Sequence, residues 1–260
     1  MLEPISTSLS DPSEWRETSQ FPALGQLEIH VWRINLHRDD AEAARLEDCL
    51  VQPERERAAR FHFPQDRRRF VIRRAVLRHL LGGYTECRPE AVCLAHTMHG
   101  KPQLEQQEKP DGIEFSCSHS AELALVALTR GRKIGVDLEF HRPLPEAGEI
   151  SDAFFSPLEI EALAKAPETA KQKVFFDAWA RKEAFVKALG LGLAFPLNGF
   201  SVSLAPDQPA ALLGMENDPH ATERWSLRSI AAGPGSSAAL AFEGKEAMVK
   251  YFDWSPRKLI

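Results

Sequence analysis

Hydrophobic and polar positions follow the same order twice along this chain: a strand, then helices, then further strands. In the first round, alternation with a period of two predicts strands near residues 27–36, 91–96, 113–117 and 122–129. Apolar positions at helical spacing predict helices over residues 40–50, 53–60 and 65–81. Asp39 offers a cap for the first of these helices, and Gly82-Gly83 is expected to end the last.

The second round follows Pro143 and Pro145. It predicts helices near residues 151–165 and 169–189, and strands near residues 199–204, 224–230 and 238–243. A strand over residues 133–140, between the two rounds, is expected to form a hairpin with the strand at 122–129. The doubled order predicts an α+β fold of two similar halves, residues 21–132 and 133–260, after a loosely ordered extension at residues 1–20.

Composition narrows the class of protein. With 260 residues, 43% hydrophobic and 27% charged, the chain has enough apolar side chains to bury a core, which argues against disorder. The longest apolar run, residues 123–128, is too short to span a bilayer, and residues 1–12 carry no secretory pattern. The four cysteines lack metal-ligand spacing. We therefore expect a cytoplasmic protein with reduced thiols at Cys49, Cys87, Cys93 and Cys117.

Arginines are concentrated in one stretch of a chain whose net charge is −5. They are Arg55, Arg57, Arg60, Arg67, Arg68, Arg69, Arg73, Arg74 and Arg78. Such a cluster suits phosphate groups or an acidic partner. The alternative is a pair of solvated helices whose arginine stems cover apolar surface. Nucleic acid is disfavoured, because no basic strand with interleaved aromatic residues accompanies the arginines.

Two acids share one face of the predicted strand at residues 133–140. A strand places Asp137 and Glu139 on one side and Val136, Leu138 and Phe140 on the other. Like charges at neighbouring positions repel, and a divalent cation bound between them removes that penalty. Oxygen ligands favour Mg²⁺ or Mn²⁺ over zinc. The alternative is a wet sheet face on which both acids meet only solvent.

The predicted helix at residues 169–189 carries a third acid. Glu183 and Lys187 are four residues apart and project side by side. Another face of the helix has an apolar stripe that anchors it in a core, made of Phe175, Trp179, Val186 and Leu189. A carboxylate and an ammonium can therefore meet the Asp137 and Glu139 strand. An ordinary surface ion pair is the alternative.

Residues 115–120 form a strand end rich in hydroxyl groups, with one histidine. Ser118 and His119 are neighbours in sequence, and no nucleophile elbow surrounds them, so nucleophilic catalysis is disfavoured. Phosphate binding fits better, because hydroxyls, backbone N–H groups and an imidazolium all donate to phosphate oxygens. Upstream, Gly100-Lys101-Pro102 is a turn that holds a lysine at a fixed place.

In this order, four segments resemble the 4′-phosphopantetheinyl transferases of the Sfp type: residues 100–102, 118–120, 135–139 and 179–187. The resemblance implies two α+β halves related by a pseudo-twofold axis, with coenzyme A in the cleft between them. It implies transfer of the phosphopantetheine arm of coenzyme A to a serine of an apo acyl or peptidyl carrier protein, releasing adenosine 3′,5′-bisphosphate. Such carriers serve fatty acid, polyketide and nonribosomal peptide synthesis. A monomer without nucleic acid or membrane partners is expected.

The same resemblance implies roles for the acids and for one lysine. Asp137, Glu139 and Glu183 are expected to hold Mg²⁺, with Mn²⁺ as a substitute. Glu183 is also expected to accept the proton of the carrier serine, directly or through water. Lys187 is the second catalytic residue, near the diphosphate of coenzyme A.

Coenzyme A itself is expected to contact five residues: Arg57, Lys101, Ser118, His119 and Lys187. Arg69 and Arg78 are expected to support these contacts. Two positions depart from the family pattern: Ser116 stands where many members have asparagine, and Glu54 stands where a lysine phosphate contact is common.

Three other functions compete with this interpretation. A non-catalytic module could bind coenzyme A or a carrier with the same fold, but it is expected to lack one of the three acids or Lys187. A metal-dependent phosphohydrolase would use the same carboxylates with water in place of serine. The short trimeric holo-synthase type is disfavoured by the chain length and the doubled halves.

Overall fold

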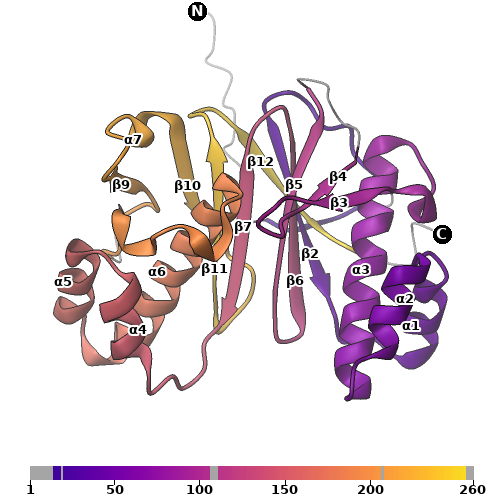
Figure 1. Cartoon of the computed structure of the whole chain (residues 1–260), viewed down its shortest axis with the longest axis horizontal. Coiled ribbons are helices and arrows are strands. Elements are labelled where there is room, and N and C mark those ends of the chain that lie inside the picture. The colour runs from indigo at the N-terminus through magenta and orange to yellow at the C-terminus, as the bar shows by residue number, and fades with distance from the viewer. Residues whose placement is uncertain (1–13, 19, 106–110, 206–207, 256–260) are drawn as a thin grey trace, which may run out of the picture.

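The computed structural model describes residues 14–18, 20–105, 111–205 and 208–255. Two β-sheets lie at the centre, with one group of helices on each outer side (Figure 1). The first group comprises α1 (Asp40–Glu47), α2 (Gln52–Ala59) and α3 (Pro64–Thr85). The second comprises α4 (Ala147–Phe154), α5 (Pro157–Lys165) and α6 (Glu168–Leu189).

The first sheet has the strand order β1 (Arg16–Glu17), β12 (Met248–Asp253), β2 (Glu28–Asn35), β6 (Leu123–Arg130), β5 (Ile113–Ser120). The second has the order β10 (Trp225–Ser229), β11 (Ser236–Glu243), β7 (Ile134–Phe140). Two small hairpins accompany them, β3 (Leu94–His96) with β4 (Pro102–Leu104), and β8 (Phe200–Val202) with β9 (Leu212–Met215). The short helix α7 (Ala221–Arg224) precedes β10.

The two halves repeat one connectivity. In the first, β2 is followed by helices and then by the β5–β6 hairpin, whose β6 pairs antiparallel with β2. In the second, β7 is followed by helices and then by the β10–β11 hairpin, whose β11 pairs antiparallel with β7. The predicted α+β class with two similar halves is therefore confirmed. The boundaries at residues 21–132 and 133–260 stay a prediction, and β12 returns from the second half to pair with β2.

Two local predictions were wrong. Strand β7 forms no hairpin with β6; it pairs with β11 in the other sheet. The sheet order explains this, because β6 lies between β2 and β5 and has no edge left for β7.

The long helix α3 does not end at Gly82-Gly83; it continues to Thr85, and Glu86 adopts the left-handed conformation at its end. The two glycines serve close packing instead. A Cβ at Gly83 would lie 2.1 Å from the Phe21 ring, and one at Gly82 would lie 2.7 Å from the Cys87 carbonyl oxygen.

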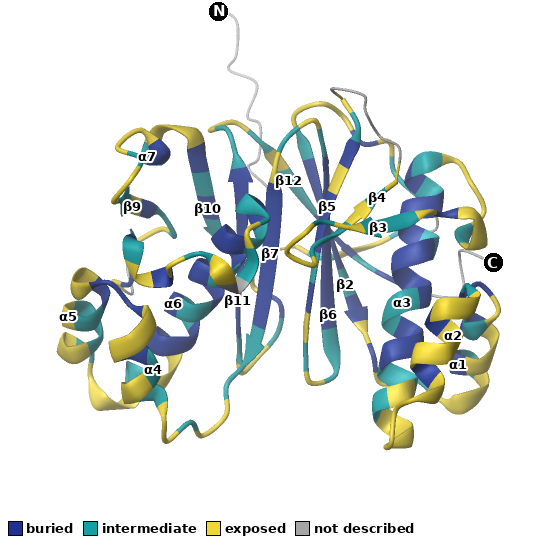
Figure 2. Cartoon of the chain, viewed as in Figure 1, coloured by how far each residue is buried: buried dark blue, intermediate teal, exposed yellow. Residues whose placement is uncertain are grey.

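Three apolar cores hold the molecule together. One lies between α3 and the first sheet, one between α6 and the second sheet, and one between the two sheets. Figure 2 shows the central strands and the inner faces of both long helices as buried. None of the described helices has both the length and the apolar character needed to cross a membrane.

The predicted N-terminal extension lies mostly outside the described residues. Of residues 1–20, residues 14–18 and 20 are described, and Arg16–Glu17 pair with β12 as β1. The indole N–H of Trp15 donates to the carbonyl of Ala231 at 2.8 Å. This part of the extension is therefore attached to the first sheet.

Candidate active site

Strands β5 and β7 are each the last strand of their sheet, and they lie side by side at the centre of the molecule (Figure 1). Serine side chains of β5 form hydrogen bonds to β7. The backbone N–H of Val136 donates to Ser116 Oγ at 3.1 Å, and that of Phe140 donates to Ser120 Oγ at 3.1 Å. The strand carrying Asp137 and Glu139 is therefore held against the strand carrying Ser118 and His119.

A glycine brings the same strand against α6. A Cβ at Gly135 would lie 2.0 Å from the carbonyl oxygen of Ala184 and 2.4 Å from the backbone nitrogen of Ala188. No other residue type allows this approach, because real Cβ atoms do not pack that closely. Gly135 thus lets the helix that carries Glu183 and Lys187 lie directly on the strand that carries Asp137.

Asp137 is the centre of the resulting site. It is 3% exposed, and its Oδ1 accepts from Lys187 Nζ at 2.6 Å and from Ser118 Oγ at 2.8 Å. Lys187 Nζ also donates to Ser118 Oγ at 3.0 Å. Although burial opposes the charged form of Lys187, the adjacent Asp137 raises the pKa of this lysine, so it stays protonated at pH 7.

The two glutamates lie in the same electrostatic environment. Burial and repulsion from Asp137 raise the pKa of Glu183, and the same two causes raise the pKa of Glu139. Oδ2 of Asp137 and Oε1 of Glu183 are buried and have no hydrogen-bond partner among the described residues. Buried carboxylate oxygens without a donor are unfavourable, so the site lacks positive charge.

A divalent cation would supply the positive charge that these carboxylates lack. The donor set is oxygen only, which suits Mg²⁺ or Mn²⁺, and a cation would partner the two orphan oxygens and relieve repulsion among the three acids. Within the described residues no three acidic, histidine or cysteine side chains are already gathered closely enough to hold an ion. Lys187 is the cation nearest Asp137 instead, at 2.6 Å.

A pocket of about 220 Å³ opens between the two halves beside this cluster. The first half contributes residues 99–102, Ser116 and Cys117, and the second contributes Glu183, Lys187 and the turn after α6. Lys101 lines it, with its Nζ donating to the Ile134 carbonyl at 2.8 Å, and burial lowers the pKa of this lysine. The sequence-predicted Lys101, Glu183 and Lys187 therefore share one pocket.

His119 contacts one of the clustered arginines and is close enough to Lys187 to feel its charge. Nη1 of Arg73 lies 2.6 Å from Nδ1 of His119. Although the ring is partly exposed, desolvation and the charges of Arg73 and Lys187 lower the pKa of His119 to about 4. The imidazole is therefore neutral at pH 7. Arg73 and Arg57 both lie over the Phe70 ring, at 5.9 and 5.3 Å, which brings Arg57 toward the same end of the site.

Most of the clustered arginines are neutralised within the protein. Arg67, Arg68, Arg69, Arg74 and Arg78 pair with carboxylates, and Arg55 donates to two carbonyls. Glu54, which the resemblance marked as a departure from the family pattern, is 6% exposed and joins Arg74 and Arg78. Arg69 and Arg78, the expected supports, are therefore engaged in ion pairs. Arg57, Arg60 and Arg73 have no ion pair among the described residues.

The sequence did not predict that Arg73 contacts His119 or that Ser120 bonds to β7. Nothing in the sequence separates Arg73 from its neighbours, since only the position of His119 on another element singles it out. For Ser120 a signal was present: Ser116, Ser118 and Ser120 recur with the period of a strand, which places their hydroxyls on one side.

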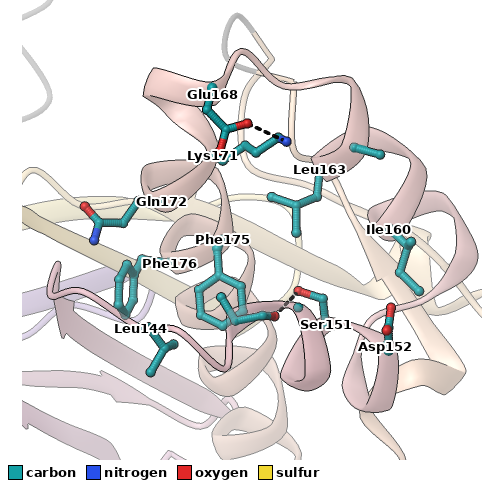
Figure 3. A pocket seen from close by; sticks show the side chains of 13 residues that line it. Leu144, Ser151, Asp152, Ile160, Leu163, Glu168, Lys171, Gln172, Phe175 and Phe176 are labelled. Atoms are coloured by element: carbon teal, nitrogen blue, oxygen red, sulfur yellow. Dashed lines mark hydrogen bonds and ion pairs between the residues drawn. The ribbon is translucent and has the colours of Figure 1, made fainter.

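A second pocket, of about 450 Å³, lies between α4, α5 and α6 and contains none of these residues (Figure 3). Its lining is mainly apolar, with Leu144, Ile160 and Phe175 among its walls. Among the polar groups drawn in it, Lys171 pairs with Glu168 at 2.7 Å and Ser151 Oγ donates to the Ala147 carbonyl at 2.7 Å. It therefore offers no comparable chemistry.

Comparisons with known proteins cover both halves. Residues 133–242 match the family model described as 4′-phosphopantetheinyl transferase superfamily, and residues 33–130 match that described as 4′-phosphopantetheinyl transferase, N-terminal. The chain is 37% identical over 230 residues to the 4′-phosphopantetheinyl transferase HetI of Nostoc sp., covering 88% of this chain and 91% of that one. It is 30% identical over 159 residues to Sfp of Bacillus subtilis, covering 61% and 68%.

Proposed function

The chain belongs to the 4′-phosphopantetheinyl transferases, and on that premise we propose that it moves the phosphopantetheine group of coenzyme A to a serine of an apo carrier protein. Adenosine 3′,5′-bisphosphate leaves, and the reaction depends on Mg²⁺. The observation that carries the proposal is the partly buried cluster of Asp137, Glu183 and Lys187, in which two buried carboxylate oxygens have no partner among the described residues. Such a cluster suits a charged ligand that brings its own cation.

The acids would hold the metal, and one of them would handle the proton. Asp137, Glu139 and Glu183 offer oxygen ligands for Mg²⁺, which, when bound, neutralises charge on the diphosphate. The hydroxyl of a carrier serine is a weak nucleophile at neutral pH and needs a base. Burial and Asp137 raise the pKa of Glu183, which strengthens it as a base, and its Oε1 has no hydrogen-bond donor among the described residues, so it can accept that proton, directly or through water.

The cations of the cleft suit the rest of coenzyme A. Lys187 stays protonated and would stabilise charge on the diphosphate side as the P–O bond to adenosine 3′,5′-bisphosphate breaks and the serine O–P bond forms. Lys101 can donate to the nucleotide part, and Ser118 can do so if its hydroxyl turns from Asp137 to the ligand. His119, neutral at pH 7, can still donate one N–H. Arg73 and Arg57, which have no carboxylate partner in the described part of the chain, offer positive charge for a phosphate.

Mass spectrometry of an apo acyl carrier and an apo peptidyl carrier tests the proposal. Each carrier is incubated with the enzyme, coenzyme A and Mg²⁺, and we expect its mass to rise by one phosphopantetheinyl group. A carrier whose acceptor serine is replaced by alanine should stay unchanged. Consumption of coenzyme A without carrier modification would indicate a phosphohydrolase and overturn the proposal, as would binding of coenzyme A without any turnover.

A further inference from the structure

Three serines on β5 connect it to the acid-bearing strand β7. Ser116, Ser118 and Ser120, which we call the serine ladder, alternate along β5 and share one side of the strand. Each contacts β7 differently: Ser116 meets only backbone, Ser118 meets the Asp137 carboxylate, and Ser120 meets both kinds of group. The ladder is therefore placed to set the position of β7 and of its side chains.

Ser120 contacts the Glu139 side chain as well as the backbone next to it. Its Oγ accepts the N–H of Phe140 at 3.1 Å and donates to Glu139 Oε2 at 3.3 Å. A hydroxyl both accepts and donates, so one residue can fix the strand and aim the carboxylate at once.

A competing group acts on the same oxygen. Arg142 Nη1 lies 3.9 Å from Glu139 Oε2, and the Arg142 side chain is 62% exposed. This exposed cation attracts the same carboxylate oxygen that Ser120 contacts. Ser120 contacts that oxygen from the neighbouring strand β5, where its hydroxyl is also bonded to the β7 backbone.

We propose that Ser120 is a positioning residue that orients the Glu139 carboxylate toward the divalent cation of the site. The inference rests on the proposed function, because it assumes that the acids hold a metal. Groups that hold metal ligands in place change metal affinity when removed, by about 10-fold at the lower end of measured effects. Ser116 makes the same kind of bond to the β7 backbone but touches no carboxylate, which makes it a matched control.

Mn²⁺ binding measured by electron paramagnetic resonance of the free ion, in the presence of saturating coenzyme A, tests this role without reference to turnover. Ser120→Ala should raise the Kd for Mn²⁺ about 10-fold. Ser116→Ala should change that Kd less than Ser120→Ala does, because Ser116 lines the pocket but touches no carboxylate, although both variants lose an acceptor for a β7 backbone N–H. Ser120→Thr, which keeps the hydroxyl, should restore the wild-type Kd.

The outcomes separate this role from the proposed function. Wild-type protein that binds no Mn²⁺ with coenzyme A present would overturn both. Wild-type binding with an unchanged Kd in Ser120→Ala, or an equal rise in Ser116→Ala, would overturn the role of Ser120 alone. If Ser120→Ala does not fold, Ser120→Cys, whose thiol is a weak donor, gives the same comparison, and a wild-type Kd there would overturn it too.

Discussion

Helix α6 carries two lysine–carboxylate networks that differ in one respect. In the first, Lys182 Nζ donates to both oxygens of Glu159, at 2.9 and 2.6 Å, and to the Phe200 carbonyl at 2.8 Å. Glu159 also accepts the backbone N–H groups of Ser156 and Val202, each at 2.8 Å, and both charged side chains are fully buried. Every polar atom of this network has a partner.

The second network, five residues further along α6, is open. Lys187 meets one oxygen of Asp137, while the other Asp137 oxygen and one Glu183 oxygen are buried without partners among the described residues. Both networks join a lysine of α6 to a carboxylate. A closed network fixes structure, because any change leaves a buried charge uncompensated. An open network has unmet interactions that a bound ligand can complete, so we expect the first to control stability and the second to control transfer.

Replacing Glu183, the proposed base, should have the largest effect. Glu183→Gln removes one carboxylate from the open network, and with it both the proton acceptor and an expected metal ligand. We expect the rate of carrier modification, followed by mass spectrometry, to fall about 10⁴-fold while circular dichroism stays unchanged. A variant that keeps near-normal turnover would contradict the role of Glu183.

Breaking the closed network of Lys182 and Glu159 should lower the stability of the fold instead of the rate of transfer. Lys182→Met leaves Glu159 buried without its counter-charge, and we expect the free energy of unfolding, measured in urea, to fall by about 3–5 kcal/mol. Activity per folded molecule should be retained. Lys165→Met, which breaks an exposed pair with Glu161, is the control and should leave the unfolding free energy unchanged. Lost activity with unchanged stability in Lys182→Met would contradict the contrast between the two networks.

Arg57, which lies with Arg73 over the Phe70 ring, allows a test of whether the site recognises the 3′-phosphate of coenzyme A. Arg57→Ala should raise the KM for coenzyme A about 10-fold, the scale of one lost charge-assisted hydrogen bond. The KM for 3′-dephospho-coenzyme A should change much less, since that analogue lacks the phosphate. Arg60→Ala, which removes an exposed arginine from the same stretch, is the control. Equal increases for the two substrates would rule out a 3′-phosphate contact at Arg57.

The smallest effect concerns pH. Because burial and Asp137 raise the pKa of Glu183 in the folded protein, its ionised form opposes folding. The stability that Glu183 contributes is present below its unfolded pKa and is lost as the pH rises through the higher folded pKa. We therefore expect Glu183→Gln to be more stable than wild type at pH 7, by about 1 kcal/mol, in metal-free urea titrations.

The same comparison at lower pH is its control. The advantage of Glu183→Gln should shrink as the pH falls toward 4.5, because the wild-type carboxyl then becomes neutral. An advantage that is independent of pH would show that it does not arise from the charge of Glu183. Turnover by the wild-type enzyme should decline over the same acidic range, since Glu183 must be ionised to accept a proton.

Local sequence patterns determined much of this protein. Period-two alternation located β2 and β7 and placed Asp137 and Glu139 on one face, while helical spacing put Glu183 beside Lys187. Such patterns succeed because a residue's face on a strand or helix depends only on its neighbours in the chain.

Only the tertiary structure decided which elements meet. Pairing of β7 with β11, the contact of Arg73 with His119, and the bond of Lys187 to Asp137 join residues far apart in the chain. The sequence does not distinguish the clustered arginines of residues 55–78 from one another, yet most of them form ion pairs with carboxylates of other segments. These contacts depend on how the whole fold packs. The local pattern allows many pairs of elements to meet, and a close approach such as that of Gly135 to α6 selects one of them.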